Sequence, residues 1–205
     1  VVSAVMKNAA NSAAGLWSAA EAAQATGGES RGDWRADGVS IDSRTLAPGD
    51  LFVALKGPNH DGHDHVGQAF GARAAAAMVE RAPDIESAET PLLIVPDSLE
   101  GLWALAKAAR ARSAARIVAV TGSVGKTGSK DLIAQALATA GPVSVSAGNL
   151  NNHIGAPLSL ARLSAEAAYG VFELGMNQPG EIAPLARLAR PHVVLVTNVE
   201  AVHTE

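Results

Sequence analysis

The chain has 205 residues, a formal net charge of −4, 48% hydrophobic and 18% charged residues, and no cysteine. This length permits one large or two small domains, and the negative charge argues against a general nucleic-acid-binding protein. The lack of cysteine excludes disulfides and thiolate metal sites, and neither a membrane-spanning run nor a signal peptide is visible, so we expect a cytoplasmic protein.

The first half of the chain predicts short elements separated by glycine and proline turns. Residues 1–15 are expected to be a leader without fixed structure. Ser98 is the predicted N-cap of a long helix, and the basic, alanine-rich stretch 110–116 predicts a junction between domains 16–112 and 113–205. The predicted helices here are 16–25, 66–73 and 98–112, and the predicted strands are 38–41, 51–55, 75–79 and 92–95.

The second half alternates clearly between strands and helices. This alternation predicts an α/β domain with a mostly parallel, doubly wound sheet. The apolar face of its first helix is predicted to contain Leu132, Ile133, Ala136 and Leu137. The predicted strands are 116–120, 143–146, 169–174 and 193–197, and the predicted helices are 126–140, a short helix from Pro157, and 181–189.

The join between the first of these strands and its helix has the character of a phosphate-binding loop. Glycines allow the backbone to approach a phosphate, while loop N–H groups and a helix N-terminus favour negative charge. Lys126 is placed to reach the β- and γ-phosphates of ATP, and the Thr127 hydroxyl is placed to hold Mg²⁺. The alternative is a glycine-rich turn with an exposed lysine. The candidate nucleotide-binding residues are Thr121, Gly122, Ser123, Val124, Gly125, Lys126, Thr127 and Gly128.

Ligands of parallel sheets bind beyond the carboxyl ends of the strands, and two further residues fall at that edge. Glu173 lies near the end of the third predicted strand, and His203 lies a few residues past the fourth. Both are candidates for a site that converges on the ATP phosphates. The alternatives are a carboxylate that caps a neighbouring helix and a histidine on a surface loop.

The loop lacks the usual early glycine, since Val120 stands there, and instead resembles the T-G-x-x-G-K-T loop of the Mur ligases. These enzymes are ATP-dependent amide ligases of peptidoglycan precursor synthesis. Further segments match, in family order, the class that adds D-alanyl-D-alanine to UDP-N-acetylmuramoyl-tripeptide. They are Ile41 to Arg44, Pro48 to Gly57, Asp61-Gly62-His63, Gly148 to Pro157, Glu173 to Asn177, Pro179 to Ile182, Thr197-Asn198 and His203.

The resemblance implies a small N-terminal UDP-sugar-binding domain followed by a P-loop ATPase domain. ATP would convert the tripeptide carboxylate into an acyl phosphate, which the amine of D-Ala-D-Ala attacks. Lys126, Glu173 and His203 would be catalytic, and Thr127, Glu173 and His203 would hold magnesium. Ser43 and Arg44 would contact the uridine diphosphate; the alternative is a turn with a solvated arginine.

Two polar clusters have more than one interpretation. Asn149, Asn151 and Asn152 are either turn formers or contacts to substrate amides. The stretch 60–65 contains three histidines and two aspartates, but residues so close together rarely enclose a tetrahedral ion, and the resemblance also accounts for them.

The family is normally more than twice as long as this chain. We therefore expect domain 113–205 to be incomplete, and residues 1–205 alone to be inactive without a C-terminal region that supplies the remaining contacts to ATP and the amine. Two other functions stay open. One is the Mur ligase that adds the third peptide residue, and the other is a nucleotide-binding fragment without turnover.

Overall fold

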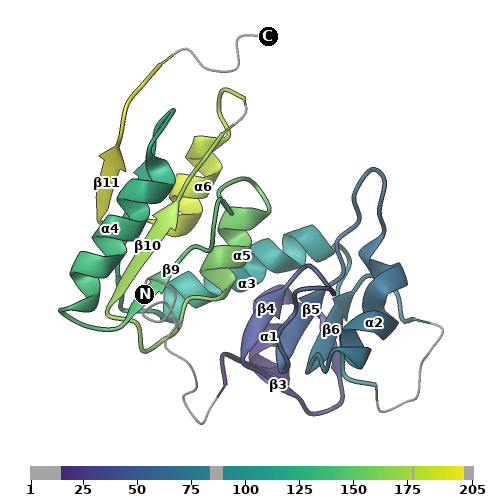
Figure 1. Cartoon of the computed structure of the whole chain (residues 1–205). Helices are drawn as coiled ribbons and strands as arrows, with labels where there is room; N and C mark the ends of the chain where they lie inside the picture. The colour runs from purple at the N-terminus through teal and green to yellow at the C-terminus, as the bar shows by residue number, and fades with distance from the viewer. Residues whose placement is uncertain (1–14, 84–89, 177, 201–205) are drawn as a thin grey trace. The chain divides into compact units, whose positions relative to one another are not determined.

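The computed structural model describes residues 15–83, 90–176 and 178–200, and the chain divides into two compact units. One unit ends at Leu105 and the other begins at Ala106, so helix α3 (Ser98–Arg112) crosses the division (Figure 1). The predicted boundary after residue 112 falls at the last residue of this helix. Each unit contains helices and its own parallel-stranded sheet, which confirms the predicted α/β class. In the described parts of the chain, no helix is long and apolar enough to cross a membrane.

The first unit is built on a five-stranded sheet in the order β2-β7-β6-β5-β4. Four of these strands pair in parallel, and β2 joins β7 in antiparallel orientation. The strands are β2 (Glu29–Arg31), β4 (Gly38–Ser40), β5 (Asp50–Val53), β6 (Ala76–Val79) and β7 (Leu92–Ile94). A separate antiparallel ribbon joins β1 (Trp17–Ser18) to β3 (Arg35–Ala36). The short strands β1, β2 and β3 were not predicted.

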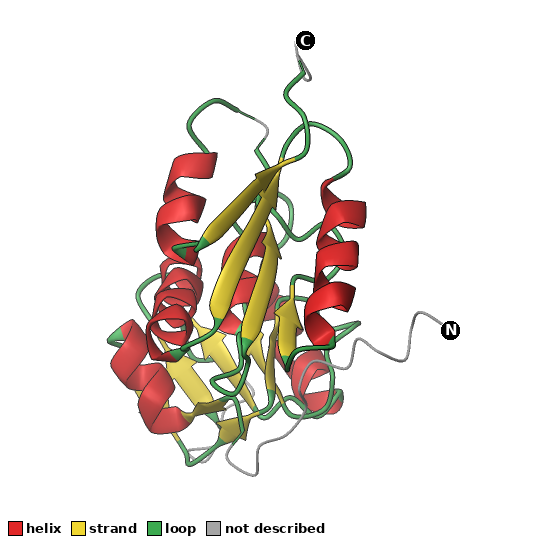
Figure 2. Ribbon diagram, turned by 90° about the vertical axis from the view of Figure 1, so that its left-hand side faces the viewer, coloured by secondary structure: helices red, strands yellow, loops and turns green. Residues whose placement is uncertain are grey.

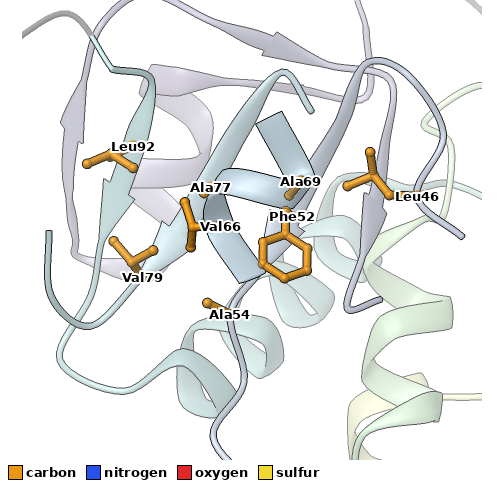
Figure 3. Packing of buried hydrophobic residues seen from close by; sticks show 8 residues of the cluster. All are labelled: Leu46, Phe52, Ala54, Val66, Ala69, Ala77, Val79 and Leu92. Carbon is orange, nitrogen blue, oxygen red and sulfur yellow. The ribbon is translucent and has the colours of Figure 1, made fainter. Parts of the chain in front are cut away.

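The register of this sheet builds a core beneath α2 (Val66–Gly71). Phe52 stands opposite Ala77, and Ala77 stands opposite Leu92, so the three side chains form one row. This row packs with Val66 and the other labelled residues of Figure 3. Burial of a side chain such as Phe52 or Leu92 contributes about 1.5–3 kcal/mol. The core therefore fixes the sheet of the first unit together with its helix.

Two helices of this unit begin at side-chain caps. Ser18 and Glu21 form a capping box at the start of α1 (Ala19–Thr26), so this helix begins three residues after its predicted start. At α3 the Asp97 carboxylate accepts the N–H of Glu100 at 2.8 Å. The prediction of Ser98 as the cap is therefore wrong by one residue, because Asp97 is an equally good capping residue and stands first.

The second unit contains a four-stranded sheet in the order β11-β8-β10-β9, with every neighbouring pair parallel. Helix α4 packs against β8, β9 and β10, α6 contacts β8, and α5 contacts both α6 and β10. Figure 2 shows helices on both sides of this sheet, as in a doubly wound fold. The bounds are β8 (Arg116–Thr121), α4 (Lys126–Ala138), β9 (Val143–Val145), α5 (Gly155–Ala161), β10 (Tyr169–Glu173), α6 (Ile182–Ala189) and β11 (Val193–Val196).

The face of α4 that meets the sheet differs from the predicted one. Leu132 is 68% exposed, and Ala136 is also exposed, so these two assignments are wrong. The buried face contains Lys130 where an apolar residue would be expected. The apolar residues of the sequence therefore indicated a face that is rotated from the buried one. The sheet-facing residues are Lys130, Ile133, Ala134 and Leu137, which follow the helical spacing of three and four.

The strand order creates a switch point at β8. From β8 the chain passes through α4 to β9 on one side of the sheet, and it later returns through α6 to β11 on the other side. Crevices for ligands form outside the carboxyl ends of strands at such points. The ends of β8, β10 and β11 are therefore where a binding site is expected.

Candidate functional site

Gly122 gives the loop after β8 its shape. Its φ of 131° lies in a region that side chains rarely adopt. A Cβ at this position would collide with Thr197 Oγ1 and would lie 2.9 Å from the Asn198 carbonyl oxygen. Glycine is therefore required where the loop passes the end of β11.

The segment after β11 holds this loop in place. Thr197 Oγ1 donates to the Val124 carbonyl at 2.6 Å, and the Val124 N–H donates to Asn198 Oδ1 at 2.9 Å. The Ser123 N–H donates to the Asn198 carbonyl at 3.1 Å. Sequence reasoning assigned no role to Thr197 or Asn198. The available signal was their position, since they directly follow a strand that pairs in parallel with β8.

The first turn of α4 is open toward this edge. Gly125 is its N-cap residue with φ of 84°, and no side chain caps the helix. A Cβ on Gly125 or Gly128 would meet no atom within 4 Å, so space remains above the turn. Uncapped N–H groups and the positive end of a helix of 13 residues together favour an anion here. The loop therefore fits a phosphate group.

Lys126 bends back over the loop. Its Nζ donates to the Gly122 carbonyl at 2.7 Å and to the Ser123 carbonyl at 3.2 Å. The side chain is half-buried, so it differs from the freely exposed lysine of the alternative interpretation. These contacts place the positive charge at the mouth of the loop, where it can neutralise a phosphate.

A buried carboxylate lies beside the first turn of α4. Glu173 is 1% exposed at the end of β10. Its Oε2 accepts from Thr127 Oγ1 at 2.9 Å, and its Oε1 accepts from Asn151 Nδ2 at 2.7 Å. Its N–H donates to Ser146 Oγ at 3.1 Å. The carboxylate thus bonds to side chains of α4 and of the loop after β9, and it accepts no helix N–H among the described residues.

The Thr127–Glu173 pair has the chemistry of a magnesium site. Burying a carboxylate is unfavourable unless a cation or hydrogen bonds compensate. In the described part of the chain two neutral side chains, and no cation, contact this one. A hydroxyl and a carboxylate are oxygen donors that suit Mg²⁺. The structure thus brings together two of the three predicted metal ligands; His203 lies outside the described residues, as does Asn177.

The three asparagines after β9 differ in their surroundings. Asn151 bonds to Glu173 as described above. Asn152 Oδ1 accepts the N–H groups of Ile154 and Gly155 at 3.1 and 2.9 Å, so it forms the turn that begins α5. Asn149 is exposed. Only Asn151 therefore belongs to the carboxylate cluster.

In the first unit, Ser43 and Arg44 point to different partners. Ser43 is buried, and its Oγ donates to Gln68 Oε1 at 2.9 Å. Arg44 is exposed and donates from Nε and Nη2 to the two carboxylate oxygens of Asp42 at 2.9 and 2.7 Å. These side-chain hydrogen bonds lower the pKa of Asp42 to about 2 and raise the pKa of Arg44.

His63 is held in a network rather than presented to solvent. The Glu80 N–H donates to Nε2 at 2.9 Å, so the ring hydrogen belongs on Nδ1, which lies 2.6 Å from Asp61 Oδ1. The His63 N–H, and then the Arg81 guanidinium, hold the pKa of Asp61 well below its usual range. Both ring nitrogens are occupied, so in this arrangement the network stabilises the turn before α2.

Family models and sequence relatives agree with these motifs. The model of the Mur ligase family catalytic domain matches residues 35–124, and that of the Mur ligase middle domain matches residues 120–205. The UDP-N-acetylmuramoyl-tripeptide–D-alanyl-D-alanine ligase of Escherichia coli K12 is 46% identical over 179 residues, which cover 87% of this chain and 39% of the relative. The ligase of the same name from Bacillus subtilis is 40% identical over 168 residues, 82% of this chain and 37% of the relative.

Solved structures resemble the chain in the same way. The D-alanyl-D-alanyl ligase of Acinetobacter baumannii superposes with a TM-score of 0.78 at 35% identity, covering 91% of this chain and 42% of that structure. MurF ligase of Thermotoga maritima, solved in complex with ADP, gives a TM-score of 0.66 at 32% identity, covering 82% and 39%. The chain thus spans about two fifths of the proteins it matches.

Proposed function

This chain belongs to the Mur ligase family, and we propose that it forms the nucleotide-binding part of a ligase that adds D-Ala-D-Ala to UDP-N-acetylmuramoyl-tripeptide. The observation that carries the proposal is the hydrogen bond from the exposed Thr127 to the buried Glu173, beside the uncapped N-terminus of α4. The relatives described above support the choice of substrates, because both sequence relatives bear the name of this reaction. We place the reaction in the bacterial cytoplasm, in peptidoglycan precursor synthesis.

The proposed roles follow from the geometry of the loop. The first N–H groups of α4 bind ATP phosphates, and Lys126 leaves the loop carbonyls to neutralise them. Thr127 and Glu173 hold Mg²⁺, which neutralises the charge of the transferring phosphoryl group when bound. Asn151 orients the Glu173 carboxylate. Since such transfer depends mainly on position and charge, these residues are proposed to supply this chain's contribution at the ATP phosphates.

The proposed reaction has two steps. A carboxylate oxygen of the tripeptide attacks the γ-phosphorus of ATP, and the bond to ADP breaks. The amine of D-Ala-D-Ala then attacks the acyl carbon of this acyl phosphate, inorganic phosphate leaves, and the amine loses a proton. His203 stays a predicted ligand of a second ion. Contacts to the amine and to the ATP base are proposed to lie in the part of the relatives that this chain does not match.

We also propose that residues 16–112 bind the uridine diphosphate group. Arg44 is the main candidate, because its guanidinium is exposed and can exchange the Asp42 carboxylate for a phosphate. Ser43 is a weaker candidate, since its hydroxyl is buried against Gln68. Asn149 and Asn152 remain candidate substrate contacts from the second unit.

The test is product formation by the full-length protein. UDP-N-acetylmuramoyl-tripeptide, ATP and Mg²⁺ are supplied with D-Ala-D-Ala, and the dipeptide precursor is supplied in parallel with a third amino acid. A product whose mass equals that of UDP-N-acetylmuramoyl-tripeptide plus D-Ala-D-Ala minus one water supports the proposal. Product only in the parallel reaction would identify the ligase of the third residue. Nucleotide binding without either product would indicate a nucleotide-binding protein without turnover.

A further inference from the structure

A second lysine of α4, Lys130, has no role in the site described so far. It is one turn after Lys126, yet it is 2% exposed. Its Nζ donates to the Ser146 carbonyl at 2.8 Å and to the Gly148 carbonyl at 2.9 Å. Its third close partner is Asp131 Oδ1 at 3.4 Å. An ammonium group has three hydrogens, so the protein itself occupies all of its donor positions.

Both carbonyl partners belong to the segment that carries the carboxylate cluster. Ser146 follows β9 directly, and its hydroxyl accepts the N–H of Glu173. Gly148 has φ of 50° and starts the loop in which Asn151 donates to Glu173 Oε1. Lys130 therefore ties the first turns of α4, which carry Thr127, to the loop that carries Asn151.

The two lysines differ in what they can reach. Lys126 contacts carbonyls of its own loop from a half-buried position and can turn toward a phosphate. The Lys130 side chain lies on the buried face of α4. Burying an ammonium group is unfavourable unless it is fully hydrogen-bonded. An apolar side chain would serve at a position that only needed to be buried, so the buried ammonium group indicates a use for its two hydrogen bonds to carbonyls.

We propose that Lys130 is a positioning residue that holds the 146–151 segment so that Asn151 orients Glu173 beside Thr127. This inference rests on the proposed function only for the identity of the cation, Mg²⁺. Groups behind a metal ligand typically change metal affinity by about 10- to 100-fold when they are removed. The same effect is expected here without direct contact between Lys130 and nucleotide.

The test compares Lys130→Met with Arg110→Met as a matched control. Arg110 is also a buried cation bonded to carbonyls, those of Ala189 and Arg190, but these lie at the far end of α6. Each substitution replaces a buried cation by an apolar chain. Hydrogen exchange is measured on the protein without nucleotide. Lys130→Met should raise exchange at the amides of Leu150 and Gly175 by about 10-fold or more relative to those of β8.

The second readout is the Mg²⁺ concentration needed for half-maximal ADP binding. Lys130→Met should raise it by about 10-fold or more, and Arg110→Met should leave it unchanged. In the double variant Lys130→Met/Asn151→Ala, the increase should not exceed that of Asn151→Ala alone, because both substitutions interrupt one path.

Unchanged exchange in the loop, an unchanged Mg²⁺ requirement, or additive effects in the double variant would each overturn the inference. These outcomes are distinct from failure of the proposed function. If the proposed function is wrong, the unsubstituted full-length protein forms no product. Hydrogen exchange in the 146–151 segment of Lys130→Met would still report whether Lys130 positions that segment.

Discussion

Replacing Glu173 by glutamine separates the role of its charge from the role of its shape. The glutamine oxygen can accept from Asn151 Nδ2, and its NH₂ group can donate to a reoriented Thr127 hydroxyl, so both contacts of 2.7 and 2.9 Å are retained. Hydrogen bonds to a charged group exceed neutral ones by about 1 kcal/mol, but the buried charge is also removed. The free energy of unfolding without metal should therefore change by about 1 kcal/mol or less.

Cation binding should change far more. Two unit charges 4 Å apart attract by about 4 kcal/mol at an effective dielectric constant near 20, and a divalent ion doubles this value. If desolvation offsets two thirds of that attraction, roughly 3 kcal/mol remains, which corresponds to about 100-fold in Mg²⁺ affinity.

The assay titrates Mg²⁺ at constant ADP and follows nucleotide binding by calorimetry, with urea unfolding of the metal-free protein beside it. Glu173→Gln should shift the Mg²⁺ midpoint by about 100-fold while the unfolding midpoint moves little. A wild-type Mg²⁺ midpoint in this variant would refute the assignment. So would a loss of more than about 2 kcal/mol without metal, because the carboxylate would then have a structural role.

Three further substitutions test other parts of the account. Lys126→Met should lower ADP affinity by about 10-fold or more with little change in the thermal midpoint, because its partners are loop carbonyls; calorimetry and thermal unfolding check this. Gly122→Ala should cost about 1–3 kcal/mol of stability in urea unfolding and remove ADP binding, since a Cβ collides with Thr197 Oγ1; a fully stable variant would contradict the loop geometry. Because the folded-state pKa of Asp42 is lowered to about 2, its contribution to stability is present above pH about 4 and is lost toward pH 2. Arg44→Ala should therefore flatten the fall of the unfolding free energy over this range, by a small amount since the pair is exposed, and an unchanged slope would exclude the pair as its cause.

The strand–helix alternation of the second unit could be predicted because β8 and β10 are mostly apolar runs with a glycine close behind them, and because helical spacing follows β8. The strands β1, β2 and β3 could not, because each is two or three residues long and holds at most one apolar residue, so no apolar run marks it. The glycine loop predicted Thr127, and the end of a parallel strand predicted Glu173; their hydrogen bond shows that they meet, while their role as metal ligands stays a prediction.

The contacts that organise the site were harder to predict. The pairing of Asn151 with Glu173 depends on the three-dimensional course of a loop, and asparagine is equally common in turns. Lys130 was missed because a lysine is normally assigned to a solvent-exposed face. Its signal was its spacing of three, four and seven residues from Ile133, Ala134 and Leu137, which places it on the buried face of α4.

The most direct test of the nucleotide site is a crystal structure of the full-length protein with ADP and Mn²⁺, a cation whose anomalous scattering locates it unambiguously. The account predicts a manganese peak within coordinating reach of Thr127 Oγ1 and, directly or through one water, of the Glu173 carboxylate. It also predicts the β-phosphate on the first N–H groups of α4, with Lys126 turned from the Gly122 carbonyl toward it. A nucleotide bound elsewhere, or a manganese ion remote from both side chains, would contradict it.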